Sequence, residues 1–179
     1  MSVFTNPASS APEQARQYVA AVLDLLGDSD PIPLLRRTPD ALGATLKELS
    51  QDQVTQPEAA GKWSVRDVLQ HLADSELVWG YRLRMVLAQD RPRLTGYDQD
   101  LWARRLRYQQ ADPMEALERF RVLRRSNLNL LEGASEGDLQ RVGVHAERGE
   151  ESIEHMVRLY AGHDLVHLRQ LERIRTAVT

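Results

Sequence analysis

A chain of 179 residues, 42% of them hydrophobic, can bury the core of one globular domain and is not composed like a disordered protein. Its formal net charge of -3 argues against a nucleic-acid partner, because such partners usually meet a basic face. The absence of cysteine excludes disulfides, thiolate metal ligands and a cysteine nucleophile, so a metal site would need His, Asp or Glu.

The N-terminal residues are small and polar. We expect a flexible tail over residues 1–10, followed by a single domain over residues 11–179. The tail lacks the charged start and apolar run of a secretory signal. No stretch approaches the roughly 18 apolar residues of a membrane span. We therefore expect a cytoplasmic protein with no membrane partner.

The first two helices are marked by stop and start residues. Apolar spacing predicts a helix over residues 12–26, with Gly27 as its C-terminal stop. After a turn, Thr38 is typical of an N-cap and Pro39 of the first helical position. We predict a second helix from there to about Leu49.

The clearest helix start in the chain is a capping box. Ser64 can accept from the backbone N–H three residues on, and Asp67 can reach back to the N–H of Ser64. Trp63 lies where a hydrophobic staple would pack on the first turn. The pattern predicts a long helix from there to about Ala88.

A long connection follows over residues 89–111, and connections of this length inside a domain are often functional. It carries Tyr97 and Trp102, around which we expect a short helix. Asp112, followed by proline, then starts another long helix that should run to about residue 131.

A second connection, over residues 132–151, precedes a last helix from about Ser152 to residue 175. No segment has a convincing strand pattern. Four long amphipathic segments with polar connections predict an all-α fold, a four-helix bundle with an extra N-terminal helix. Arginine runs at 104–107 and 119–125 are interleaved with acids and indicate solvated charged faces.

Two histidines share one face of the last helix. With about 100° between successive residues, His167 falls inside the apolar stripe, and His163 lies at its edge, one turn away. The two imidazoles would lie about 6 Å apart, which suits chelation of one metal ion. His155 falls on the opposite, wet face, and we exclude it.

His71 lies on the flank of the apolar stripe of the helix that begins after Ser64. It could point obliquely into the bundle, or its imidazole could bond a backbone carbonyl. Three neutral imidazoles would make a site with open positions, as in catalytic rather than structural metal centres. Nitrogen donors suit Zn, Ni, Co, Fe or Cu without choosing among them.

Asp164 lies near the centre of the buried stripe, where an unpaired carboxylate is costly. It either forms a salt bridge with an arginine such as Arg82 or Arg124, or serves as an acceptor beside a metal ligand or as a general base. His145 lies in the glycine-bearing second connection, where a histidine is more often a surface residue than a ligand.

Three separated motifs resemble the DinB/YfiT-like superfamily. They are, in chain order, Gly61–Ser75, Arg91–Trp102 and Tyr160–Leu168. The resemblance spans about residues 34–174 and implies a four-helix bundle, often dimeric, with a metal site of three histidines. Carried over to this chain, the metal ligands are His71, His163 and His167.

The same resemblance bears on the surroundings of the metal. The stretch after Val144 is similar to a loop of the YfiT-like branch, which implies His145 as a pocket residue. Glu76 stands where some relatives carry another histidine, and Val166 stands where relatives often have a second one. Glu76 or His145 could fill a fourth position on the metal.

The family includes transferases that use low-molecular-weight thiols and proteins described only as metal-dependent hydrolases. The resemblance favours a thiol transferase of the bacillithiol type. One divalent ion, with Zn or Ni favoured, would ionise a cosubstrate thiol that attacks an electrophilic small molecule. Tyr97 and Trp102 would line the pocket, Asp164 is the candidate catalytic residue, and we expect a homodimer.

Two alternatives to thiol transfer stay open at this point. The first is a hydrolase with a metal-activated water. The second is a non-enzymatic, stress-related bundle in which the metal is structural or carries a ligand.

Overall fold

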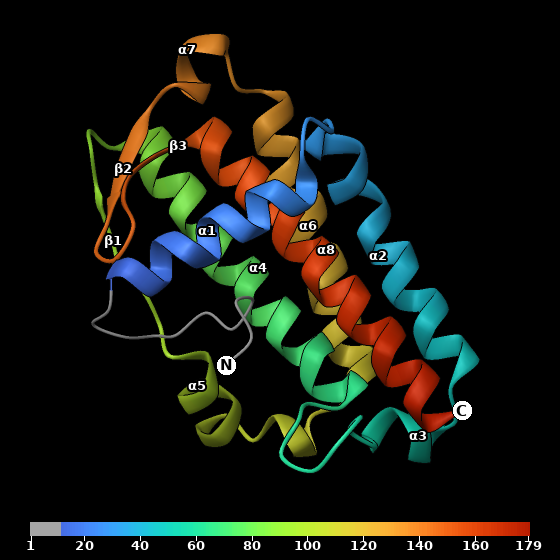
Figure 1. The fold of residues 1–179 in the computed structure, drawn as a ribbon. Helices are drawn as coiled ribbons and strands as arrows, with labels where there is room; N and C mark the ends of the chain where they lie inside the picture. The colour runs from blue at the N-terminus through green and yellow to red at the C-terminus, as the bar shows by residue number, and fades with distance from the viewer. Residues whose placement is uncertain (1–11) are drawn as a thin grey trace.

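The computed structural model describes residues 12–179, so the expected tail over residues 1–10 lies outside the described part. Helices dominate the fold (Figure 1). The long helices are α1 Pro12–Leu26, α2 Pro31–Glu48, α4 Val65–Ala88, α6 Pro113–Glu132 and α8 Ile153–Val178, and the short ones are α3 Gln51–Thr55, α5 Gln99–Arg105, the 3-10 turn η1 Tyr108–Gln110 and α7 Glu136–Leu139. No helix within residues 12–179 is long and apolar enough to cross a membrane.

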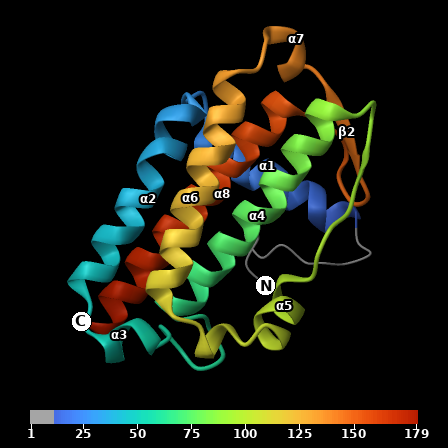
Figure 2. The same cartoon turned by 180° about the vertical axis from the view of Figure 1, so that it is seen from behind.

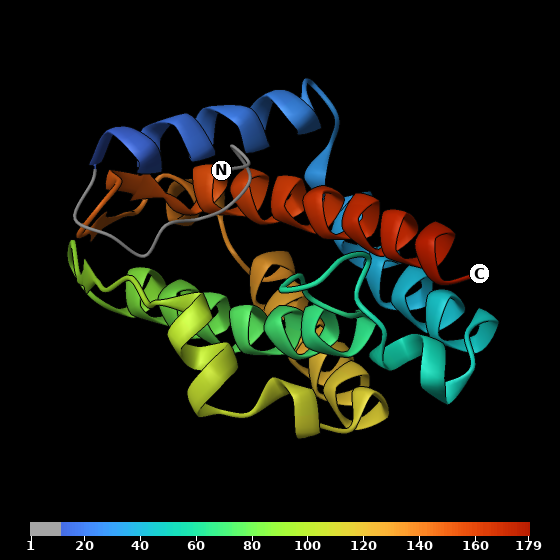
Figure 3. The ribbon, with the colours of Figure 1, turned by 60° about the horizontal axis from the view of Figure 1, so that its bottom comes forward.

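Helices α2, α4, α6 and α8 form the predicted four-helix bundle (Figures 1 and 2). α2 and α8 run in one direction and pack on each other, while α4 and α6 run in the other direction and form the second pair. Because α4 and α6 are parallel, residues 89–112 return along the length of the bundle. α1 packs on the outer side of α8 and is the expected extra N-terminal helix (Figure 3).

One end of the bundle carries a small three-stranded sheet. β1 Arg93–Leu94 pairs in parallel with β2 Val142–His145, which pairs antiparallel with β3 Gly149–Ser152. The prediction of no strands was wrong, because strands of 2 or 4 residues are too short to show a period-two pattern. The sheet joins the two long connections to each other.

Most helix ends follow their predicted signals. The Ser64 hydroxyl accepts from the Asp67 N–H at 3.3 Å, and the Asp67 carboxylate accepts from the Ser64 N–H at 2.9 Å, which confirms the capping box. Gly27 follows α1 with a φ of 58°, a conformation that glycine adopts at little cost. Asp112 and Ser152 cap α6 and α8.

The predicted start of the second helix was wrong. α2 begins at Pro31, where the Asp30 carboxylate accepts from the Ile32 N–H at 3.0 Å. Thr38 lies inside the helix, is buried, and donates its hydroxyl to the Leu34 carbonyl at 3.0 Å. Asp30–Pro31 and Thr38–Pro39 both have the residues of a helix start. Because the turn before Thr38 is buried as part of the helix, the helix begins at the earlier pair.

Pro39 lies within α2 and frees a carbonyl of that helix. Because proline has no backbone N–H, Pro39 cannot donate a hydrogen bond to the carbonyl four positions before it, which is that of Leu35. The Nη1 atom of Arg124, in α6, donates to the Leu35 carbonyl at 2.9 Å. The helix therefore continues past Pro39 while a neighbouring helix satisfies the freed acceptor.

Arg124 is the centre of a buried polar network that joins all four bundle helices. Its side chain is 1% exposed and donates to both oxygens of Asp164 in α8, at 2.7 and 3.0 Å. It also donates to Glu76 in α4 at 2.9 Å. The prediction of a solvated arginine face was wrong for Arg124, because its phase on α6 turns it inward, whereas most arginines of the two runs are exposed.

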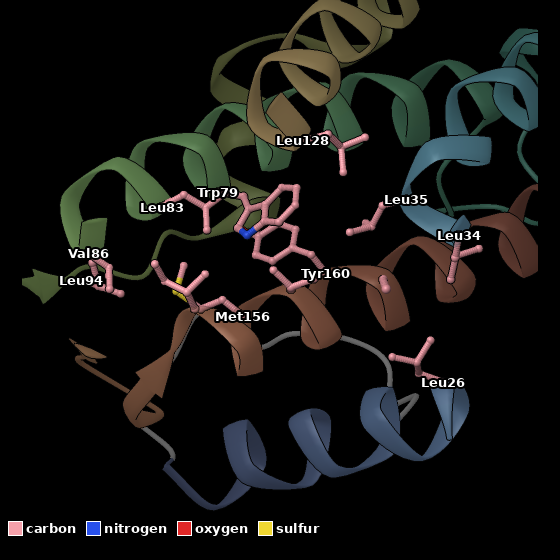
Figure 4. Packing of buried hydrophobic residues seen from close by; sticks show 13 residues of the cluster. Leu26, Leu34, Leu35, Trp79, Leu83, Val86, Leu94, Leu128, Met156 and Tyr160 are labelled. Carbon is pink, nitrogen blue, oxygen red and sulfur yellow. The ribbon is translucent and has the colours of Figure 1, made fainter. Parts of the chain in front are cut away.

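Buried apolar side chains of α1, α2, α4, α6 and α8 form a core cluster, which Figure 4 shows. The Trp79 ring of α4 stacks on the Tyr160 ring of α8, with centroids 4.6 Å apart and an angle of 16° between the planes. The guanidinium carbon of Arg124 lies 5.6 Å from the centroid of the Trp79 ring. The aromatic pair and the polar network thus form one continuous contact between α4, α6 and α8.

Replacing Arg124 by leucine should destabilise the fold severely, because Glu76 and Asp164 would become buried charges without a counterion. We expect the free energy of unfolding, measured by urea titration, to fall by about 3–5 kcal/mol. As a control, Arg36→Leu breaks an exposed pair with Glu132 and should cost no more than about 1 kcal/mol. Equal losses in the two variants would contradict the central place of Arg124.

Candidate metal centre

Three imidazoles meet between α4 and α8. The Nε2 atom of His163 lies 3.3 Å from that of His71 and 3.1 Å from that of His167. Ligand atoms of the three residues all lie within 4.8 Å of one another, and no other group of three or more His, Cys, Asp or Glu residues within 12–179 does so. The structure therefore brings together the three histidines that the sequence singled out.

Burial keeps these imidazoles neutral. Loss of hydration lowers the pKa of His71 and His163 well below the usual value for histidine and lowers that of His167 to about 4. Repulsion between the neighbouring rings lowers the pKa of His71 and His163 further. At neutral pH each ring therefore offers one nitrogen lone pair, which is the form that binds a metal.

Neighbouring side chains orient two of the three rings. His167 Nδ1 lies 2.8 Å from the amide oxygen of Gln170, one turn further along α8. Because a carbonyl oxygen only accepts, Nδ1 donates and Nε2 carries the lone pair. The Trp63 ring packs on the His71 ring, with centroids 4.9 Å apart. Gln170 was missed from the sequence, although its spacing of three residues from His167 was a usable signal.

The spacing of the three nitrogens fits one ion. A zinc ion bound at about 2.0–2.1 Å in tetrahedral geometry holds its nitrogen ligands about 3.3 Å apart, and the observed separations are 3.1 and 3.3 Å. Glu76 supplies no fourth ligand, because its carboxylate bonds Arg124 and Asn127. His145 lies outside the group of ligand atoms. The histidines, aspartates and glutamates of residues 12–179 thus leave at least one position on such an ion open.

Two hollows border the three histidines. The smaller, of ≈ 40 Å³, reaches His71 and His163 and is bounded by the return segment and the β2–β3 hairpin. The larger, of ≈ 330 Å³, reaches His167 from the side of α1 and the loop before α4. The site is therefore approached from two sides.

Tyr97, which the sequence singled out as a pocket residue, lines the smaller hollow. Its hydroxyl shares a 2.7 Å hydrogen bond with Ser75 Oγ, which lies 3.4 Å from His71 Nε2. Burial raises the pKa of Tyr97, so its hydroxyl stays protonated at neutral pH. Trp102 packs on the Tyr97 ring, with centroids 4.5 Å apart, but lines neither of the two hollows itself.

Of the remaining candidates, His145 joins the site and Asp164 does not. His145 is 2% exposed and lines the smaller hollow. Asp164 forms the salt bridge with Arg124, which was the alternative to a catalytic role, and both of its oxygens are engaged. His155 is half-buried rather than on a fully wet face, and it lies outside the group of ligand atoms.

Sequence reasoning missed Arg82, Glu147 and Tyr160 as residues that line the smaller hollow. They come from α4, from the hairpin turn and from α8. Pairing of β1 with β2 brings residues 89–112 and the β2–β3 hairpin together, and no local sequence pattern predicts that pairing.

Known proteins are similar to this chain in sequence and in fold. The family model of the DinB superfamily matches residues 34–171. A protein of Oceanobacillus iheyensis named "putative metal-dependent hydrolase" is 31% identical over 134 residues, which cover 74% of this chain and 77% of the relative. A protein of Bacillus licheniformis with a name of the same kind is 28% identical over 142 residues, which cover 79% of this chain and 81% of that relative.

One solved structure has a closely similar arrangement of helices. It is YfiT from Bacillus subtilis, described as "a probable metal-dependent hydrolase with an unusual four-helix bundle topology". The two chains superimpose with a TM-score of 0.74 and 22% sequence identity, over 95% of this chain and 90% of YfiT. At that identity the likeness shows a common fold.

The buried histidines predict that the metal-free protein loses stability as the pH falls. The unfolded chain takes up protons on histidine near about pH 6.5, whereas in the folded chain the pKa is about 4 for His167 and about 3 for His145. The free energy of unfolding should therefore fall from pH 7 to pH 5, by about 2 kcal/mol for each such histidine.

Urea titrations of the metal-free protein at pH 7, 6 and 5 measure this slope. His145→Gln removes one of the buried titrating groups and should flatten the slope. His155→Gln is the matched control and should keep it, because the three converging imidazoles and His145 stay in place. A metal-free wild type that is equally stable at pH 7 and pH 5 would rule out neutral, buried histidines.

Proposed function

This chain belongs to the DinB superfamily, and from this membership and the three converging imidazoles we propose that it is a metal-dependent hydrolase. His71, His163 and His167 bind one divalent ion through their Nε2 atoms. The observation that carries the proposal is the convergence of three neutral imidazoles without a fourth His, Asp or Glu among residues 12–179, the pattern of catalytic centres. The all-nitrogen donor set suits zinc or nickel. The names of the relatives support hydrolysis as the reaction class.

A bound ion supplies a Lewis acid that lowers the pKa of a coordinated water to about 7. The chain itself supplies hydrogen bonds. The Tyr97 hydroxyl, kept protonated by burial and positioned by Ser75, can donate to the oxygen of a polarised carbonyl group. Hydrolysis then adds water across an ester or amide bond: a C–O bond forms, the bond to the leaving group breaks, and the leaving group takes a proton.

Thiol transfer is the second candidate, and the larger hollow favours it. A hydrolase needs room for one organic substrate, whereas a thiol transferase needs room for two. The ≈ 330 Å³ hollow reaches His167, shares Tyr18 and Gln99 with the lining of the smaller hollow, and has Lys62 and Arg169 in its own lining. Since the chain has no cysteine, the sulfur would come from a cosubstrate, and it would bond an electrophilic carbon as the leaving group departs.

Metal binding is tested by His163→Ala, with His155→Ala as the matched control on the same helix. After purification with added zinc or nickel, the wild type and the control should each hold about one ion per chain, measured by mass spectrometry of the metal. His163→Ala should hold less than about a tenth of that, because two imidazoles remain. Equal metal in the wild type and His163→Ala would show that the ion binds elsewhere or not at all.

An assay with chromogenic esters and amides tests the reaction class. The metal-loaded wild type should turn over at least one of them without added thiol, and metal removal or His163→Ala should abolish that turnover. Turnover only when a small thiol and an electrophile are supplied together would replace hydrolysis by thiol transfer. A metal-loaded protein that is inactive in both assays would refute both candidates.

A further inference from the structure

Arg82 lies in the lining of the smaller hollow without a carboxylate partner. The side chain, on α4, is 4% exposed and donates to the Thr95 carbonyl. Within residues 12–179 it forms no ion pair, whereas the buried guanidinium of Arg124 binds two carboxylates and that of Arg148 binds Glu151. A buried cation without a counterion is costly, so this one calls for an anion from outside the described chain.

His145 presents a second donor to the same hollow. Its Nδ1 accepts from the Glu147 N–H at 3.2 Å, so the proton of the neutral ring lies on Nε2. That Nε2 atom is buried and has no hydrogen-bond partner among residues 12–179. Burial, with the charges of Arg148 and Arg82, lowers the pKa of His145 to about 3, so the ring stays neutral. A fully buried N–H without a partner indicates a missing acceptor.

The Tyr160 hydroxyl is a third donor at this place. Its ring is held by stacking on Trp79, as Figure 4 shows, and the residue lines the hollow together with Arg82 and His145. Burial raises the pKa of Tyr160, and the charge of Arg82 is the largest of the opposing effects. The hydroxyl forms no hydrogen bond within residues 12–179 and stays protonated at neutral pH.

We propose that Arg82, His145 and Tyr160 form an anion-binding subsite beside the three converging imidazoles, and that it holds a carboxylate group of the substrate. The planar fork of an arginine matches the two oxygens of a carboxylate. The hollow of ≈ 40 Å³ has room for a group of about that size. Binding of the anion does not depend on a metal, whereas the role in substrate recognition rests on the proposed function.

Glu147 offers a variant that should change the affinity for the anion in the opposite direction from an Arg82 variant. Its carboxylate lines the same hollow but forms no ion pair with Arg82 within the described chain. A Cβ atom at Gly96 would lie 2.6 Å from a Glu147 carboxylate oxygen, so the side chain packs closely on that glycine. A negative charge at this place repels an incoming carboxylate. Its removal should therefore strengthen anion binding, while removal of the Arg82 charge should weaken it.

The experiment is a titration followed by NMR of the imidazole signals of the full chain labelled with ¹⁵N-histidine. Acetate is the probe and acetamide its neutral isostere, at constant ionic strength and pH 7. In the zinc-loaded wild type, acetate should shift the His145 signals with a dissociation constant in the millimolar range, and acetamide should not. The shift should persist after dialysis has removed the zinc. Its loss would mean that acetate binds the metal, and would overturn the subsite.

Acetate affinity in single-residue variants shows which side chains hold the anion. Arg82→Gln should weaken acetate binding at least about 10-fold, whereas Arg125→Gln, which removes the same charge from the exposed face of α6, should leave it unchanged. Glu147→Gln should tighten it. If Arg82→Gln fails to fold, Tyr160→Phe removes only a hydroxyl and should weaken binding several-fold. No saturable shift of His145 in the wild type, or equal affinity in Arg82→Gln and Arg125→Gln, overturns the subsite without bearing on metal binding.

Discussion

The guanidinium of Arg124 determines how the bundle helices are rotated, because each of the other three supplies it with an acceptor. α8 supplies both oxygens of Asp164, α4 supplies Glu76, and α2 supplies the carbonyl of Leu35 that Pro39 leaves without a helical partner. A cation buried this deeply is tolerated only while these partners stay in place. A small rotation of one helix would break a charged hydrogen bond inside the core, so the network fixes the face that each helix turns inward.

That constraint positions the histidines. His163 directly precedes Asp164 on α8, and Glu76 follows His71 by five residues on α4, so the two carboxylates set the phase of both metal-binding segments. The imidazoles then face one another with their Nε2 atoms 3.1 and 3.3 Å apart across His163. Burial keeps them neutral, and no fourth His, Asp or Glu of residues 12–179 belongs to the group, which leaves a position on a bound ion open for water or substrate. The same helices carry the unpaired Arg82 and Tyr160 into the adjoining hollow, so one bundle geometry serves both the metal site and the proposed anion subsite.

Sequence patterns predicted the helix ends and the histidine positions that depend on contacts within one or two helical turns. The capping box at Ser64 and the glycine stop at Gly27 were read correctly, because the groups that satisfy them lie within one turn. Helical phase sufficed for His163 and His167, which share one helix. His71 needed the family resemblance, since phase alone left it on the flank of its helix, whereas the structure buries it with 1% exposed.

Two of the errors share a physical cause, which is that long-range contacts override local preference. Thr38 and Pro39 have the residues of a helix start, but α2 already begins at Pro31, and Arg124 from α6 satisfies the carbonyl that Pro39 frees. Arg124 belongs to a run that the sequence indicated as solvated, although it was also named as a possible partner of Asp164, and its two carboxylate partners are 40 and 48 residues away in the sequence. The small sheet was missed for two reasons: β2 and β3 form a local hairpin of strands too short to show a period-two pattern, and β1 joins them from a distant segment.

The most direct test of the metal centre is a crystal structure of the zinc-loaded protein with anomalous scattering at the zinc edge. We expect one anomalous peak within about 2.0–2.1 Å of the Nε2 atoms of His71, His163 and His167. An occupied zinc site elsewhere, with the three imidazoles not coordinating, would contradict the proposed metal centre.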